Sequence, residues 1–101
     1  MTYLDYLDTW VAEQLPVLEG LGDVTYRRSE FDRSNPSAHL LLAYDDTDVE
    51  LLLWESGEAE FNFGPVGAAV YEHHEIVAIG DLDTLLAKFL ATATGDSGGH
   101  P

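Results

Sequence analysis

The sequence predicts an α+β fold in which an antiparallel sheet meander of four or five strands lies between an N-terminal and a C-terminal helix. Apolar residues recur every three or four positions near both ends of the chain, and every second position in short segments between them. Short turn-forming segments separate the predicted strands, which favours antiparallel neighbours. We expect one domain over residues 1–91 and a disordered tail over residues 92–101, where Gly, Ser and Thr accumulate.

The first predicted element is a helix over residues 3–19. Thr2 precedes it as an N-cap, and Gly20 ends it. Pro16 removes a backbone donor and is expected to kink or shorten the last turn. One apolar stripe runs along the helix through Leu4, Leu7, Val11, Leu15 and Leu18.

Five short strands follow, each rich in strand-forming residues and bounded by turn signals. They are expected at residues 24–29, 38–44, 49–55, 58–63 and 68–74, the last with an extension to residue 79. A second helix then begins after Asp81, the predicted N-cap. Its apolar stripe consists of Leu82, Leu85, Leu86, Phe89 and Leu90.

Ser56-Gly57, taken as a two-residue hairpin loop, sets a register for the third and fourth strands. It pairs Glu55 with Glu58 and Leu52 with Phe61. The predicted core set is Leu52, Trp54, Phe61 and Phe63, and the opposite face carries Val49, Leu51, Leu53, Glu60 and Asn62. Two interpretations of that opposite face stay open: a contact surface for another protein or a second copy, or a face covered by a helix or the tail.

Composition and charge exclude several classes of function. The chain has no cysteine, so it forms no disulfide scaffold, zinc-thiolate site or thiol nucleophile. A net charge of −15, from 4 Lys+Arg and 19 Asp+Glu, disfavours nucleic acid and anionic membrane and favours a basic partner, although it also serves solubility. Without a basic N-terminal region or a long apolar run, we expect neither signal peptide nor membrane span, and a cytoplasmic location.

Glu72-His73-His74-Glu75 is the one segment that looks like a metal or acid–base site. On a strand, however, His73 and His74 point to opposite faces, and their spacing lacks the helical i, i+4 pair of zinc enzymes. No serine lies in a nucleophile elbow, and no glycine-rich phosphate loop occurs. We therefore predict no catalytic residue, no metal ligand and no cofactor. A small metal-dependent enzyme using His39, His73 and His74 remains the third-ranked hypothesis.

The segment 49–61 contains Trp54-Glu55-Ser56-Gly57-Glu58 and is followed by Tyr71-Glu72-His73-His74-Glu75 and an acidic, leucine-rich helix. This succession resembles the TriTu family of bacterial immunity proteins, small cytoplasmic proteins associated with polymorphic toxin systems. The resemblance implies a non-catalytic protein that neutralises a cognate toxin by direct binding. The motif residues that it carries over are Trp54, Glu55, Gly57, Glu58, Glu72, His74 and Glu75.

The first hypothesis is therefore an immunity protein that binds a basic toxin through an acidic surface. The second is a generic interaction or chaperone-like module that forms a homodimer through its sheet face. For the first, carboxylates would attract the partner, and two aliphatic residues would anchor it. The candidate contacts are Asp45, Asp46, Asp48, Leu51, Leu53, Glu55, Glu58 and Glu60.

Overall fold

The computed structural model describes residues 2–29, 34–65 and 67–95, and it confirms the predicted α+β fold. One helix, five strands and a second helix follow one another along the chain. Their bounds are α1 Tyr3–Glu19, β1 Asp23–Arg28, β2 Ser37–Tyr44, β3 Thr47–Trp54, β4 Glu58–Pro65, β5 Val70–Glu75 and α2 Ile79–Thr94. No helix in this part of the chain is long and apolar enough to cross a membrane.

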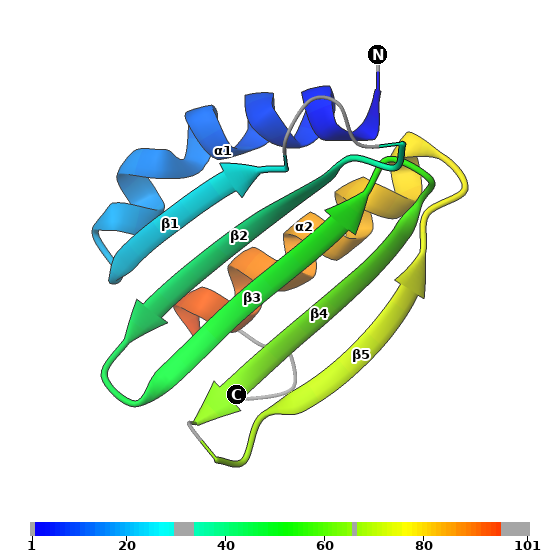
Figure 1. Ribbon diagram of the computed structural model, residues 1–101. Coiled ribbons are helices and arrows are strands. Elements are labelled where there is room, and N and C mark those ends of the chain that lie inside the picture. The colour runs from blue at the N-terminus through cyan, green and yellow to red at the C-terminus, as the bar shows by residue number, and fades with distance from the viewer. Residues whose placement is uncertain (1, 30–33, 66, 96–101) are drawn as a thin grey trace.

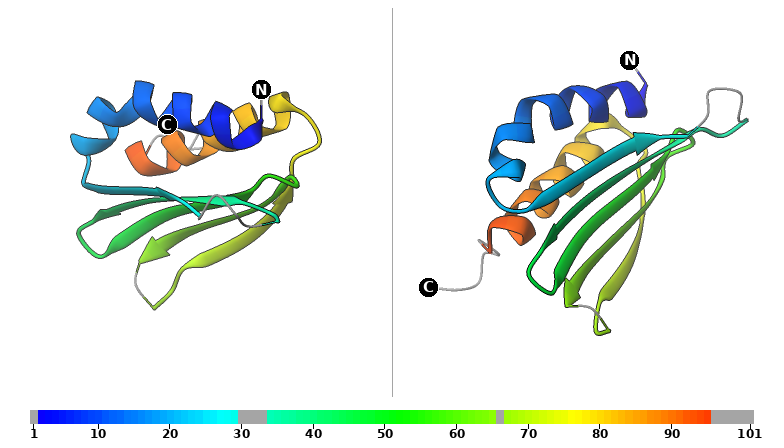
Figure 2. Two further views of the ribbon diagram at one scale, coloured as in Figure 1. Left: turned by 45° about the horizontal axis from the view of Figure 1, so that its top comes forward. Right: turned by 60° about the vertical axis from the view of Figure 1, so that its left-hand side comes forward.

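The five strands form one open antiparallel sheet in the order β1-β2-β3-β4-β5, so each strand pairs with its neighbours in sequence (Figure 1). Both helices lie against the same face of this sheet (Figure 2). Helix α1 packs on β1, β2 and β3, while α2 packs on β3 and α1. The molecule therefore has two layers, and no described helix covers the other face of the sheet.

Helix α1 follows the sequence prediction closely. The Thr2 Oγ1 accepts a hydrogen bond from the Asp5 amide at 3.0 Å, which satisfies one of the free N–H groups of the first turn. The helix continues through Pro16 to Glu19, so the proline does not end it at that position. Of the predicted stripe, Leu15 is half-buried and the other members are buried.

Helix α2 starts earlier and ends later than predicted. Its N-cap is Ala78, and Asp81 is the third helical residue, so Asp81 is not the N-cap. The Asp81 carboxylate accepts hydrogen bonds from the amides of Val77 and Ala78, at 2.9 and 3.2 Å, and caps the helix from inside its first turn. The helix runs to Thr94, so residues 92–94 are helical rather than part of a tail. Residues 96–101 lie outside the described residues.

The predicted register between β3 and β4 is wrong by one residue. The loop between them has three residues, 55–57, and Gly57 adopts a positive φ of 104°, as in hairpins closed by a turn and a bulge. This register pairs Leu51 with Phe61 and Leu53 with Ala59. The one-residue slip exchanges the two faces of β3, so Leu51 and Leu53 face the helices, while Leu52 and Trp54 face away.

The core lies between the sheet and the two helices. Alternate residues of β2, β3 and β4 supply its sheet side, beginning with Ala38, Val49 and Ala59. Phe61 is fully buried at its centre, with ring centroids 5.0 Å from Phe63 and 6.1 Å from Phe89 of α2. Trp10 of α1 makes an edge contact with Phe89 at 6.1 Å. One continuous apolar cluster therefore joins both helices to the sheet.

Candidate partner-binding face

We call the side of the sheet that faces away from α1 and α2 the outer face. The register places its side chains in two complete rows that cross all five strands. The first row is Arg27, His39, Leu52, Glu60 and His73, and the second is Thr25, Leu41, Glu50, Asn62 and Tyr71. Side chains within a row, and diagonal neighbours in adjacent rows, lie close enough to form one continuous surface.

The outer face carries apolar side chains that take no part in the core. Leu41, Leu52 and Trp54 are half-buried, yet they belong neither to the core nor to the apolar residues that pack against it. Tyr71 is 75% exposed at the edge strand β5. The solvated face of an antiparallel sheet normally carries polar side chains, and apolar patches on such a face are typical of contact surfaces.

A hydrogen-bonded network fixes the middle of the outer face. The Nε2 of His39 lies 2.6 Å from Oε2 of Glu50, and the Asn62 amide donates to Oε1 of the same carboxylate at 2.9 Å. Burial raises the pKa of Glu50, but the hydrogen bonds from Asn62 and His39 outweigh it, and the pKa is lowered. The ionised carboxylate therefore holds neighbouring side chains on β2 and β4 in place.

Replacing Glu50 with glutamine should lower the free energy of unfolding at neutral pH by about 1 kcal/mol, because hydrogen bonds to a charged group are lost. The lowered pKa sets the pH dependence. The stabilisation is present above the unfolded-state pKa of about 4.3 and disappears as pH falls through the lower folded-state value. Urea unfolding at a series of pH values should show the two proteins converging in acid. Glu58→Gln, outside the network, is the control. A constant difference down to acid pH would contradict the assignment.

Carboxylates outnumber cations on the outer face. Among the described residues, Arg27 is the one lysine or arginine whose side chain lies on the outer face. Arg28 lies instead against α1, with Nη1 2.6 Å from Asp8 and 3.4 Å from Asp5, and Lys88 of α2 lies 2.7 Å from Glu72. The carboxylates that the register places on the outer face are Asp23, Asp48, Glu50, Glu58, Glu60 and Glu75. The face is therefore acidic around an apolar centre.

The predicted contact residues fall into four groups, and Glu55 forms the last of them by itself. Asp48, Glu58 and Glu60 lie on the outer face, and Asp45 and Asp46 form the exposed turn between β2 and β3 at one end of the sheet. Leu51 and Leu53, predicted as apolar anchors, are fully buried in the core, so that prediction is wrong. The reason is the extra loop residue after Trp54, which reverses the faces of β3.

Glu55 has a structural role that the sequence pattern did not reveal. From the loop after β3, its carboxylate accepts hydrogen bonds from the amides of Tyr3 and Leu4, at 3.0 and 3.2 Å. These are free donors of the first turn of α1, where the helix dipole also favours a negative charge. Glu55 therefore ties the N-terminus of α1 to the sheet.

Glu55→Gln should lower the free energy of unfolding by about 1–2 kcal/mol, because a charged acceptor is removed from two backbone donors. Thermal unfolding followed by circular dichroism would measure the loss. Glu58→Gln removes the same charge from the next strand without touching α1, and it should cost less than about 0.5 kcal/mol. Equal losses in the two variants would show that Glu55 does not act as a helix cap.

The histidines do not converge. His73 is opposite Glu60 on the outer face, whereas His74 is opposite the buried Ala59, and its Nε2 lies 2.9 Å from Glu72 on the helix side. His39 belongs to the Glu50 network on β2. Within residues 2–29, 34–65 and 67–95, no three His, Cys, Asp or Glu side chains are grouped so as to hold a metal ion.

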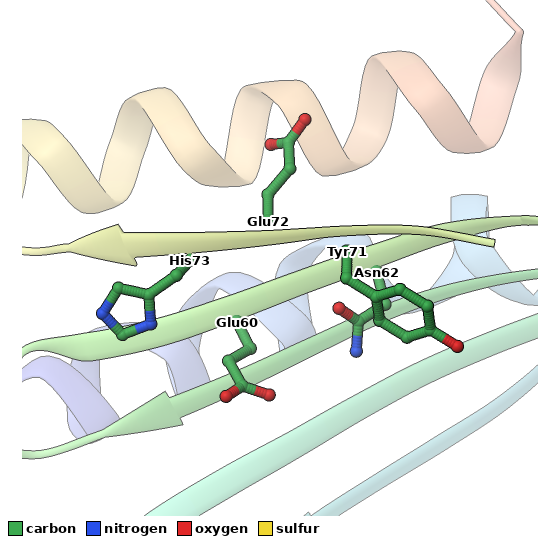
Figure 3. A pocket seen from close by; sticks show the side chains of 5 residues that line it. All are labelled: Glu60, Asn62, Tyr71, Glu72 and His73. Carbon is green, nitrogen blue, oxygen red and sulfur yellow. The ribbon is translucent and has the colours of Figure 1, made fainter.

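A shallow hollow lies where β4 meets the edge strand β5. Figure 3 shows Glu60, Asn62, Tyr71 and His73 pointing to one side of the sheet, whereas Glu72 points to the other side, toward α2. The four side chains belong to the ends of the two rows defined above.

Comparison of the chain with protein-family models, curated proteins and solved structures gave no match.

The sequence prediction missed Leu52, Trp54 and Tyr71 as surface residues. A signal for the correct face was nevertheless present in β3. Residues that share a face alternate along a strand, so a core containing Leu52 and Trp54 would also bury Glu50. Burying an acidic residue is costly unless it is paired, whereas the other alternation buries aliphatic residues alone.

Proposed function

We propose that this protein acts without catalysis, by binding a basic protein through its outer face. The observation that carries the proposal is the apolar centre of Leu41, Leu52 and Trp54, left without a described cover and bordered by carboxylates. An apolar centre within a polar rim is the usual composition of a protein interface. The resemblance to TriTu immunity proteins supports a specific form of the proposal: neutralisation of a cognate bacterial toxin.

Charge favours a basic partner over a second copy of the chain. Two copies that met through their outer faces would each bring a net charge of −15 and a border of carboxylates. Like charges across an interface cost several kcal/mol, whereas a basic surface would be attracted and would associate faster. The carboxylates are thus expected to orient the partner, while the apolar centre provides most of the affinity.

Trp54 is expected to contribute most to that affinity. It is the largest side chain on the outer face, and tryptophan is enriched among interface residues whose truncation costs 2 kcal/mol or more. Its partner across the sheet is Ser37, whose side chain is too small to cover an indole ring. Trp54→Ala should therefore weaken binding by roughly thirtyfold or more.

The test uses the toxin candidates encoded beside the gene of this protein. Each would be expressed with and without this protein, and the binding constant of a neutralised toxin would be measured by calorimetry at several salt concentrations. We expect rescued growth, affinity that falls as salt rises, and a large loss in Trp54→Ala. Val17→Ala, which truncates an apolar side chain exposed on α1, is the control. Failure to rescue growth would reject the toxin form, and full affinity in Trp54→Ala would reject the outer face as the binding surface.

A further inference from the structure

The hollow between β4 and β5 presents acceptor oxygens beside an aromatic ring. Asn62 donates its Nδ2 to Glu50, and this hydrogen bond fixes the plane of its amide. Its Oδ1 then remains available, since no described group donates to it. Glu60, across from His73, forms no ion pair with a described Lys or Arg, and Tyr71 exposes its ring next to Asn62.

These groups match one kind of ligand. A carboxylate and an amide oxygen accept hydrogen bonds and attract a cation, while the face of a tyrosine ring attracts a cation by its quadrupole. Side chains that pair across strands lie about 5 Å apart, and the diagonal between Glu60 and Tyr71 is about 7–8 Å. A planar group with several donors can bridge such a span, whereas an anion would meet the Glu60 carboxylate.

We infer that this hollow receives an arginine side chain of the basic partner, an inference that rests on the proposed function. The guanidinium stacks on Tyr71 and donates to Glu60 and to Oδ1 of Asn62. Arginine fits better than lysine because its planar fork makes several directed hydrogen bonds while its face lies on the ring. Glu50, which receives the Asn62 amide, is a positioning residue because it orients the acceptor without touching the guanidinium.

A short peptide tests the inference without the partner. The probe is acetyl-Gly-Arg-Gly-amide, added to the ¹⁵N-labelled full chain while amide chemical shifts are recorded. Saturable shifts are expected at Glu60, Asn62, Tyr71 and His73, including the Asn62 side-chain amide, with a dissociation constant on the order of 10 mM. The lysine peptide should bind at least about threefold more weakly, and the citrulline peptide, which is planar but uncharged, about tenfold more weakly.

Single substitutions separate the hollow from general electrostatic attraction. Glu60→Gln and Tyr71→Ala should each weaken binding of the arginine peptide by about fivefold or more. Glu58→Gln removes the same charge two residues away on the same face and strand, and it should change the affinity less than twofold. Glu60 and Tyr71 are exposed, so both variants should keep the wild-type spectrum elsewhere.

Three outcomes would overturn the inference: no saturable shift at these residues, shifts spread over all acidic surfaces, or equal losses in Glu60→Gln and Glu58→Gln. The result is independent of the toxin test. If a basic partner binds and depends on Trp54 but the peptide does not bind in the hollow, the arginine site is wrong and the proposed function stands. If the peptide binds there but neighbouring toxins are not neutralised, the toxin form fails and the arginine site stands.

Discussion

Gly57→Ala should lower the free energy of unfolding by about 3 kcal/mol or more. The backbone at Gly57 has a φ of 104°, a conformation that costs an L-residue with a side chain roughly 1–2 kcal/mol. A Cβ at this position would also lie 2.3 Å from the carbonyl oxygen of Ile76, much closer than atoms can approach. That oxygen belongs to the backbone, so a side-chain rotation cannot relieve the clash.

To relieve the clash, the backbone at residue 57 must move away from Ile76, and this movement should disturb contacts on both sides of the loop. The amide of Ile76 donates to the Gly57 carbonyl at 2.6 Å, so moving the two chains apart weakens this hydrogen bond. Glu55, two residues earlier in the same loop, caps the N-terminus of α1 through Tyr3. The substitution therefore threatens the contact between the β3–β4 loop, the end of β5 and the first turn of α1.

Gly67→Ala is the matched control for this experiment. Gly67 also has a positive φ, 88°, but a Cβ there would meet no described atom within 4 Å. The control should therefore cost only the conformational strain of about 1–2 kcal/mol. Urea unfolding of both variants would separate strain from close approach. Equal losses at the two glycines would show that the contact with Ile76 is unimportant.

The pattern of apolar residues predicted most of the architecture. Both helices, all five strands and their order follow from changes in periodicity and from turn residues, which act locally. The end of α2 at Thr94 and the start at Ile79 were less predictable. Capping depends on hydrogen bonds, and the Asp81 side chain serves from the third helical position as well as it would from the N-cap.

The candidate site was less predictable because it depends on register. One additional loop residue, Glu55, moved Leu52 and Trp54 from the predicted core to the outer face. Either register turns leucine side chains toward the core, because β3 has leucines on both of its faces. The role of Glu55 could not be predicted, since the two amides that it binds lie more than fifty residues away in sequence.

Phe61→Ala should destabilise the protein by about 3–5 kcal/mol, the loss typical of a fully buried phenylalanine. The ring packs against Phe63 on its own strand and Phe89 on α2, and Lys88 Nζ lies 5.7 Å from its centroid. Truncation leaves a cavity between the sheet and α2 that rigid strands cannot close. In a domain of this size the melting temperature should fall by roughly 15–30 °C.

Phe63→Ala is the control. Phe63 is half-buried on the same strand, so its truncation should lower the free energy of unfolding by about 2 kcal/mol. Similar losses at both positions would contradict the placement of Phe61 at the centre of the core. Phe61→Leu should lose less stability than Phe61→Ala and remain folded, since it retains most of the apolar volume.

The two faces of the sheet should then respond independently. Phe61 points toward the helices, whereas Trp54 points away from them, and the two side chains share no face. Phe61→Leu should lower the melting temperature and leave the affinity for the partner within about twofold. Trp54→Ala should weaken binding of the partner by roughly thirtyfold. Its loss of stability should be much smaller, since Trp54 is outside the core cluster. A loss of binding that merely followed the loss of stability in both variants would contradict a binding role for the outer face.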